Sequence, residues 1–364
     1  MIRLVKRYLA VRTLRGIGLA FLVVTGIILL IDFVEGTRNI GQDLDINSFQ
    51  VMYLTLLKAP SLIEQTIPFI VLFGVMSALY GLNRRSELVV LRASGLSAWN
   101  FLAPPIYVAC LLGLIWATIF NPIASRSLSL YQSKITATDS NVLPNDVIWL
   151  REGSETLQTL VRAESYDPRT RKLMNVTLSQ SERDVNGEFN FRTRFDAASA
   201  DLSAAGYWQL HQAKENTSDV LADAVLHDII SIPTQIRLED ITSQAKSEYI
   251  PPFWSLPTEI SRTRRAGFST IRLEMQWQKL LALPLTLVAM TVIAAGVSMH
   301  LTREGGTLRL IITGIAVGFS CYFANSIFNA FGESSTLPII IAAWTIPIMT
   351  FFLGASYLLK IEDG

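Results

Sequence analysis

LSAWNFLAPPIYVACLLGLIWATIFNPIAS, residues 96–125, is a run of thirty residues without a charged side chain. A bilayer core about 30 Å thick is crossed by roughly 20 helical residues. The run therefore predicts a membrane-spanning helix. Further apolar runs of this kind are found at residues 16–31 (continuing past Asp32 to 34), 65–83, 280–299, 310–332 and 337–359.

The composition agrees with these runs. Half of the 364 residues are hydrophobic and 17% are charged, against roughly 25% charged in an average soluble protein. The first run has the length of a signal-peptide core, but no small-residue cleavage pattern follows it, so we expect a retained span. We predict an α-helical membrane protein with six transmembrane helices.

Lysine and arginine predict the orientation, because short loops rich in these residues stay in the cytoplasm. The opposite short loops carry Arg38 and Lys58 alone. Both termini are therefore expected in the cytoplasm, and the long segment after the third span is expected outside it. The basic residues on the cytoplasmic side are Arg3, Lys6, Arg7, Arg12, Arg15, Arg84, Arg85, Arg92, Arg303, Arg309 and Lys360.

The segment between the third and fourth spans, residues 140–254, regains charge and has the pattern of a β domain. Short alternating or β-branched stretches at 147–150, 156–163, 173–181, 189–197 and 207–213 are separated by turn signals such as Asn186-Gly187 and Ala205-Gly206. This spacing favours an inserted antiparallel sandwich or roll. Residues 1–139 then hold spans one to three, and residues 255–364 hold a short amphipathic helix at the membrane boundary followed by spans four to six.

Several functional classes lack support. The net charge of +1 gives no reason to expect nucleic acid as a partner. Cys110 and Cys321 lie in apolar runs, where buried thiols are the ordinary interpretation, and the three histidines have no metal-ligand spacing. No phosphate-binding Gly-x-x-x-x-Gly-Lys-Ser/Thr motif is present. We therefore expect no catalytic site, no metal and no bound nucleotide on this chain.

NRRSELVVLRASGLS, residues 83–97, is the most informative loop. Ser86 can cap a short helix whose first turn contains Glu87, and Gly95 can end it. Such a short helix is marginal in water, so it either rests against another protein or is a turn at the lipid surface. From the residues alone these two interpretations are equally supported.

Two further groups of polar residues lie within or next to spans. Asp32, Glu35 and Arg38 share roughly one helical face near the end of the first span. They are either a head-group site or ordinary solvated span ends. Cys321, Asn325 and Asn329 form a polar line on the fifth span, for which contact between helices is a more common role than a substrate path.

The motif RSELVVLRASGLS, residues 85–97, resembles the LptF/LptG (YjgP/YjgQ) family of lipopolysaccharide export permeases, as does the order of three spans, an outward β domain and three spans. Ile67-Pro68-Phe69 with Leu72-Phe73-Gly74, residues 314–328 and residues 337–347 extend the resemblance over nearly the whole chain. The start of the motif and Asp32-Phe33-Val34-Glu35 look more like the G-type subunit than the F-type.

This resemblance implies a subunit of an ABC transporter in the bacterial inner membrane. An LptF-type subunit would be its partner in a heterodimer, an LptB dimer in the cytoplasm would bind ATP and magnesium, and the single-span LptC would receive lipopolysaccharide outside. The inserted domain would be a β-jellyroll in the periplasmic bridge. Residues 84–95 would form the ATPase-coupling helix, with Arg84, Arg85, Glu87, Leu88, Leu91, Arg92 and Gly95 as its candidate contacts.

The resemblance also implies that the first and fifth spans wall the lipid cavity. The candidate substrate contacts are then Asp32, Glu35, Arg38, Arg309, Phe319, Tyr322 and Phe328. G-type members place a lysine near the position of Asp32 and arginines near the end of the third span, where residues 125–132 are mostly Ser and Leu. This difference implies a lipid with less phosphate, a lipid variant with a neutral head group, or charge supplied by the partner subunit.

Two rival functions remain open at this point. A mechanotransmission permease would use cytoplasmic ATP to regulate an external protein without moving lipid. A secondary transporter would use an ion gradient, but the sequence shows no inverted repeat with matching broken spans.

Overall fold

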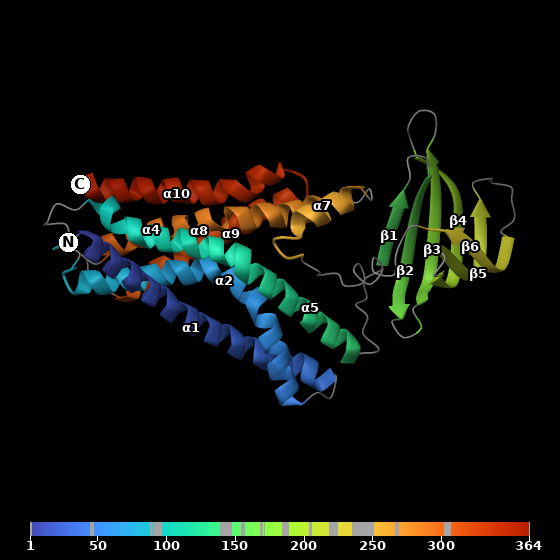
Figure 1. Ribbon diagram of the computed structural model, residues 1–364, viewed down its shortest axis with the longest axis horizontal. Helices are drawn as coiled ribbons and strands as arrows, with labels where there is room; N and C mark the ends of the chain where they lie inside the picture. The colour runs from blue at the N-terminus through green and yellow to red at the C-terminus, as the bar shows by residue number, and fades with distance from the viewer. Residues whose placement is uncertain are drawn as a thin grey trace. The chain divides into compact units, whose positions relative to one another are not determined.

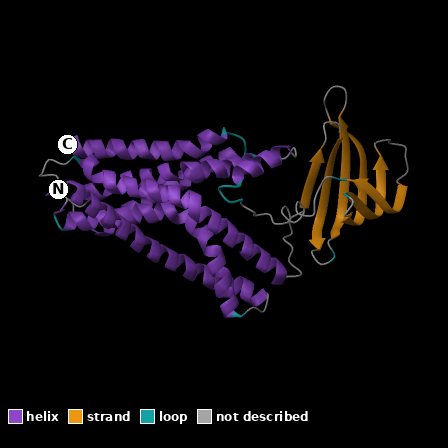
Figure 2. Cartoon of the chain, in the orientation of Figure 1, coloured by secondary structure: helices purple, strands orange, loops and turns teal. Residues whose placement is uncertain are grey.

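The computed structural model describes residues 2–43, 47–87, 90, 97–138, 148–153, 157–167, 170, 172–183, 189–203, 206–217, 225–234, 251–265, 269–301 and 307–363. The chain divides into two compact units. Met1–Tyr131, Pro251–Pro257 and Ile271–Gly364 form the first, which is helical, and Gln132–Ile250 with Thr258–Thr270 form the second, which contains the strands. Figures 1 and 2 show the elements of each unit.

The helical unit confirms the six predicted spans. In the part of the chain that the structure describes, six helices are long and apolar enough to cross a membrane. Each helix extends beyond the apolar run that predicted it, because charged and polar residues continue the helix past the hydrocarbon layer. The helices are α1 (Ile2–Asp43), α2 (Ser48–Arg84), the continuous α4 (Ala98–Ile115), η1 (Trp116–Phe120) and α5 (Asn121–Thr138), then α8 (Ile271–Leu301), α9 (Thr307–Glu333) and α10 (Ile339–Asp363).

Helix α8 and the second half of α2 contribute much of the core of this unit. Leu72 and Val75 of α2 and Leu287 of α8 are completely buried. Small residues allow the closest helix approaches, as is usual where van der Waals contact holds helices together in lipid. A Cβ added at Gly16 of α1 would lie 2.4 Å from the carbonyl oxygen of Gly74. Glycine is therefore required where α1 crosses α2.

The third span contains an irregular turn. The five residues Trp116–Phe120 form a π-helix between α4 and α5. The ring of Trp116 stacks on that of Phe120, with centroids 4.5 Å apart. A π-helix is rare and is frequently found at functional sites.

The predicted antiparallel β domain is also confirmed. Six strands form one antiparallel sheet among the described residues. Its apolar face includes Leu178, Trp208 and Leu210, which are completely buried. The strands are β1 (Ile148–Gly153), β2 (Leu157–Asp167), β3 (Lys172–Arg183), β4 (Phe189–Ser203), β5 (Tyr207–Thr217) and β6 (Val225–Pro233). Strand β6 was not predicted from the sequence, because its apolar residues do not alternate regularly.

The strand order corrects one detail of the prediction. Neighbours in the sheet are also neighbours in sequence, from β1 to β6, which is an up-and-down meander. A jelly roll in the strict sense has Greek-key connections, and the described strands do not have them. Strand order was not predictable from the alternation of residues, because each strand has the same pattern whichever neighbour it pairs with.

The alternation itself is interrupted inside the strands. Asn175 of β3 and Gln212 of β5 have φ angles of 50° and 51°, a conformation uncommon outside glycine. The buried residues of β3 change phase at Asn175, from Leu173 to Val176 and Leu178. The left-handed conformation at Asn175 and Gln212 keeps the apolar side chains on one face of the sheet, although the alternation of apolar residues in the sequence shifts by one residue.

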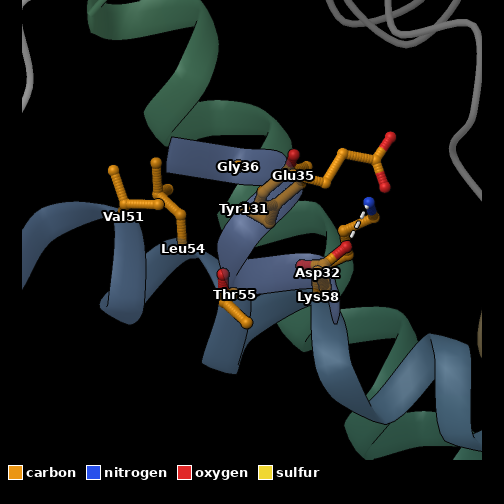
Figure 3. A pocket seen from close by; sticks show the side chains of 8 residues that line it. All are labelled: Asp32, Glu35, Gly36, Val51, Leu54, Thr55, Lys58 and Tyr131. Atoms are coloured by element: carbon orange, nitrogen blue, oxygen red, sulfur yellow. Dashed lines mark hydrogen bonds and ion pairs between the residues drawn. The ribbon is translucent and has the colours of Figure 1, made fainter. Parts of the chain in front are cut away.

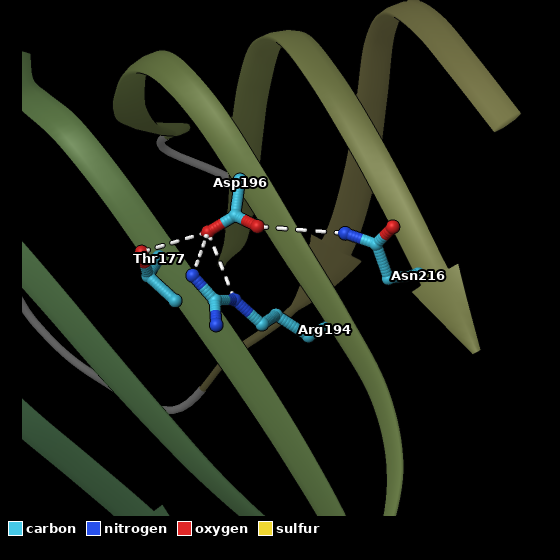
Figure 4. A network of polar contacts seen from close by, with 4 residues as sticks. All are labelled: Thr177, Arg194, Asp196 and Asn216. Carbon is cyan, nitrogen blue, oxygen red and sulfur yellow. Dashed lines mark hydrogen bonds and ion pairs between the residues drawn. The ribbon is translucent and has the colours of Figure 1, made fainter. Parts of the chain in front are cut away.

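Polar side chains also connect three neighbouring strands of the sheet, β3, β4 and β5. Figure 4 shows Asp196 of β4 accepting hydrogen bonds from Thr177 of β3 at 2.9 Å and from Arg194 at 2.8 and 3.0 Å. Asn216 of β5 donates a longer bond of 3.5 Å to the same carboxylate. This network pairs three strands through their side chains and has the character of a structural contact.

The predicted amphipathic helix is present as α7 (Leu256–Arg265). Its Leu256 is buried, and Arg262 forms an ion pair with Glu259 at 3.0 Å. Its basic residues are gathered in the last turn, where they complement the helix dipole.

Candidate functional site

The loop after α2 contains the first predicted site. The N–H of Ser86 donates to the carbonyl of Asn83 at 2.9 Å, and Ser86 has a left-handed φ of 60°. The N–H of Val90 then donates to the Ser86 carbonyl at 3.1 Å, which is the spacing of an α-helix. A new helical turn therefore begins directly after Ser86 and contains Glu87.

Glu87 is held by the first helix. The hydroxyl of Tyr8 on α1 donates a 2.8 Å hydrogen bond to Oε2 of Glu87. Arg84 and Arg85 next to it are exposed. This bond ties α1 to the loop between α2 and α4. The other residues predicted for this site, Leu88, Leu91, Arg92 and Gly95, lie outside the described residues.

Asp32 and Glu35 of the second predicted site lie near the other end of α1, and Figure 3 shows them with the other side chains that line a cavity there. Lys58 of α2 donates to Oδ1 of Asp32 at 2.7 Å. The side chains of Asp32 and Lys58 are 12% and 33% exposed, so the ion pair is mostly shielded from solvent. A cavity of about 190 Å³ is lined by Asp32, Glu35, Gly36, Val51, Leu54, Thr55, Lys58 and Tyr131.

The charges of this cavity do not favour a bare anion. Asp32 and Glu35 are carboxylates, and Lys58, the cation of the lining, already binds Asp32. A phosphate entering here has to compete with Asp32 for the ammonium group and is repelled by Glu35. Arg38 lies one helical turn beyond Glu35 and is exposed, so it is open to an anion from outside the cavity.

The predicted contacts on α9 form an aromatic surface. Phe319 is 61% exposed and stacks on Phe323 with ring centroids 6.2 Å apart. Tyr322 is 45% exposed and packs against Phe69 of α2 at 5.5 Å. Phe328 is half-buried, and the side chain of Arg309 lies outside the described part of α9. Phe319, Tyr322 and Phe328, whose side chains the structure describes, are not among the residues that line the cavity at Asp32.

Helices α1 and α9 share one property that bears on function. In their apolar stretches 6% and 11% of the residues are buried, against 67% in α8. Both therefore present most of their apolar surface to lipid, to a partner or to a ligand. They are the two spans that the resemblance assigned to the lipid cavity.

Comparison with known proteins agrees with the resemblance that the sequence showed. Residues 7–360 match the family described as lipopolysaccharide export system permease LptF/LptG. The chain belongs to this family. It is also 23% identical over 369 residues to the lipopolysaccharide export system permease protein LptG of Haemophilus influenzae, with 99% of each chain covered.

Membership of the LptF/LptG family assigns the chain its general function. It is a permease subunit of lipopolysaccharide export and a multi-pass protein of the inner membrane. The family description names two permease proteins, which agrees with a second permease subunit as a partner.

The structure adds residues that sequence reasoning missed. Tyr8 binds Glu87, and Lys58 binds Asp32. Glu64 of α2 accepts a hydrogen bond from Asn121 at 2.8 Å, inside the helical unit of this LptF/LptG member. Glu64 lies directly before the apolar run 65–83, and Lys58 lies nearly two helical turns earlier on the same helix. A charge next to hydrocarbon is costly, so Glu64 could have been singled out from the sequence.

Proposed function

We propose that this chain is the G-type permease subunit of an ATP-driven exporter that extracts lipopolysaccharide from the outer leaflet of the inner membrane. Its partners are an LptF-type permease subunit, a cytoplasmic LptB dimer that binds ATP and magnesium, and LptC, which receives the lipid. Both termini and the Glu87 loop lie in the cytoplasm, and the β unit lies in the periplasm. The likeness to LptG of Haemophilus influenzae supports the G-type assignment.

The contact between Tyr8 and Glu87 carries this proposal. Glu87 begins a helical turn in the basic loop between α2 and α4, and it is bonded to α1. A partner that moves this loop therefore moves a helix whose apolar surface is largely unburied. Binding of ATP closes the LptB dimer, and the coupling segment at residues 84–95, in which Arg84 ends α2 and a new helical turn begins after Ser86, transmits the movement. The lipid cavity walled by α1 and α9 then narrows.

The exposed surfaces of α1 and α9 support a lipid cavity shared with the second permease subunit. Phe319, Tyr322 and Phe328 offer rings to acyl chains. Arg38 and Arg309 offer guanidinium groups to phosphate. The cavity at Asp32 and Glu35 is acidic, which supports a lipid head group with less phosphate at that position.

Reversal of charge at the loop tests the proposal. In the complex with ATPase and partner permease, we expect Glu87→Arg to abolish ATPase association or ATP-dependent lipid release, while membrane insertion stays intact. Tyr8→Phe removes one hydrogen bond of an exposed pair, so association should persist and lipid release per ATP should fall by about twofold to fivefold.

The control is Glu182→Arg, the same reversal on an exposed residue of β3, whose ion pair with Arg192 is also exposed. Lipid release is measured in vesicles that contain lipopolysaccharide, as the ATP-dependent change in photo-crosslinking of the lipid to a probe at Phe319. Normal export by Glu87→Arg would refute the coupling role. A probe at Phe319 that traps no glycolipid in the active complex would favour the mechanotransmission permease instead.

A further inference from the structure

One buried amide joins three separate segments of the helical unit. Asn121, the first residue of α5, is 2% exposed. Its Nδ2 donates to Oε1 of Glu64 on α2 at 2.8 Å, and its Oδ1 accepts the backbone N–H of Phe253 at 2.8 Å. Both ends of the side chain are thus satisfied, as buried amides require. The orientation of the amide is fixed by these partners, because the N–H of Phe253 can only donate.

The irregular turn before Asn121 adds a second bond to the same segment. The indole Nε1 of Trp254 donates to the backbone carbonyl of Thr118 at 3.0 Å. Thr118 lies within the π-helix Trp116–Phe120, where the regular pattern of backbone bonds is altered. The ring of Phe253 stacks on Trp277 of α8, with centroids 4.7 Å apart. The segment at Phe253 and Trp254 is therefore fixed to the third span and to α8.

The position of these bonds in the chain is informative. The helical unit continues to Tyr131, where the chain passes to the β unit, and it resumes at Pro251. Asn121 lies on the outgoing helix, and Phe253 lies on the returning segment. Glu64 lies on α2, which ends at the loop that contains Glu87. We call Glu64, Asn121 and Phe253 the clasp, because they join both chain connections of the β unit to α2.

We propose that Asn121 is a positioning residue that transmits movement of α2 and the third span to the two chain segments that enter and leave the β unit. The inference rests on the proposed export function and assigns a residue to one step of it. The loop that contains Glu87 joins α2 to the third span (α4, η1 and α5), and these two spans meet again at the clasp, through Glu64 of α2 and Asn121 of α5. A shift of either span is passed to Phe253 through two hydrogen bonds of 2.8 Å, because Asn121 and Phe253 are buried and Glu64 is partly buried.

Four variants separate this role from a general effect on stability. Asn121→Leu removes both bonds of the amide, and Glu64→Leu removes the bond to α2. Glu64→Gln keeps an oxygen that accepts the Asn121 amide. Glu64→Gln combined with Asn121→Asp reverses the direction of the bond, because the new amide donates to the new carboxylate, whose second oxygen accepts the Phe253 N–H.

The matched control is Gln278→Leu. Gln278 accepts a 3.0 Å hydrogen bond from the Trp344 indole between α8 and α10. It is a comparable side-chain amide in the same unit, and its bond touches neither connection of the β unit. Gln278 and Glu64 are both partly buried and each accept one such bond, so Gln278→Leu should reduce stability about as much as Glu64→Leu, with lipid transfer per ATP unchanged.

The experiment uses the full chain in vesicles with its partner permease and ATPase. ATP hydrolysis, transfer of lipopolysaccharide to a photo-crosslinker at Tyr207 of β5, and hydrogen exchange of the peptide 251–257 are measured together. We expect both leucine variants of the clasp to keep ATP hydrolysis within about twofold and to lose about tenfold in lipid transferred per ATP. In Asn121→Leu the exchange of peptide 251–257 should rise by about tenfold. Glu64→Gln and the double variant should behave like the wild type.

The outcomes that contradict the clasp differ from those that contradict the export function. The positioning role would be overturned if Asn121→Leu transferred lipid like the wild type. It would also be overturned if Asn121→Leu and Gln278→Leu lost lipid transfer per ATP equally. Loss of transfer in Glu64→Gln would overturn it too, because the carboxylate itself would then be needed. Absence of ATP-dependent crosslinking in the wild-type complex would instead overturn the export function.

Discussion

Helices α1 and α8 differ in a way that their composition does not predict. The apolar stretch of α1 is the more hydrophobic of the two, yet 6% of it is buried, against 67% for α8. In a soluble protein the more hydrophobic helix usually forms the core. In a bilayer lipid is as apolar as leucine, so hydrophobicity only places a helix in the membrane. Burial follows from small residues that allow close packing.

The residues of α8 illustrate this distinction. Ala289, Ala294 and Ala295 are completely buried. By contrast, Leu22 and Leu30 of α1 are 71% and 65% exposed. The large side chains of α1 are available for contacts outside the subunit, whereas the small ones of α8 are used inside it.

The largest effect is expected where α1 does pack tightly. Leucine at Gly16 would bring its Cβ to 2.4 Å from the Gly74 carbonyl and force the two helices apart. We expect Gly16→Leu to lower the free energy of unfolding of the isolated subunit by about 2–3 kcal/mol. The matched control is Gly18→Leu, because a Cβ at Gly18 meets nothing within 4 Å. Denaturant titration in mixed micelles measures both, and equal losses would show that the crossing is not a close contact.

An intermediate effect is expected from truncation of leucine. Leu287 of α8 is completely buried, and Leu22 of α1 is mostly exposed. For Leu287→Ala we expect the free energy of unfolding to fall by about 1–2 kcal/mol, which is the cost of the cavity that the truncation leaves. The cavity is the main cost, because lipid solvates the truncated side chain as well as the original one. For Leu22→Ala we expect less than about 0.5 kcal/mol in the same titration. A comparable loss at Leu22 would place α1 in the core of the subunit.

The smallest effect concerns the ion pair that joins the far end of α1 to α2. Asp32→Asn leaves the Lys58 ammonium without its carboxylate partner, and we expect a loss of about 1 kcal/mol, because Lys58 is one-third exposed. Combining Asp32→Asn with Lys58→Met should recover most of this loss. A double-mutant cycle measures the coupling between the two residues. Strict additivity would mean that the pair contributes nothing to the position of α1.

The sequence predicted the elements more successfully than their connections. Six apolar runs and the alternating stretches of the β segment were sufficient for six spans and an inserted sheet, because each depends on local composition and period. The order of the strands and the phase change at Asn175 were not predictable, since both depend on pairing with distant strands. Tyr8 and Asn121 were missed for the same reason. Each is an ordinary residue in its own helix and gains significance from a partner far away in sequence.

The sequence by itself determined the membrane class, the spans, the place of the inserted sheet and the family motif at residues 85–97. The tertiary structure decided which spans are internal, which carboxylate meets Lys58, and that Asn121 joins α2 to both connections of the β unit. The physical reason is that insertion into lipid depends on the summed hydrophobicity of one segment. Packing and hydrogen bonding depend on the shapes and donors that two segments bring together.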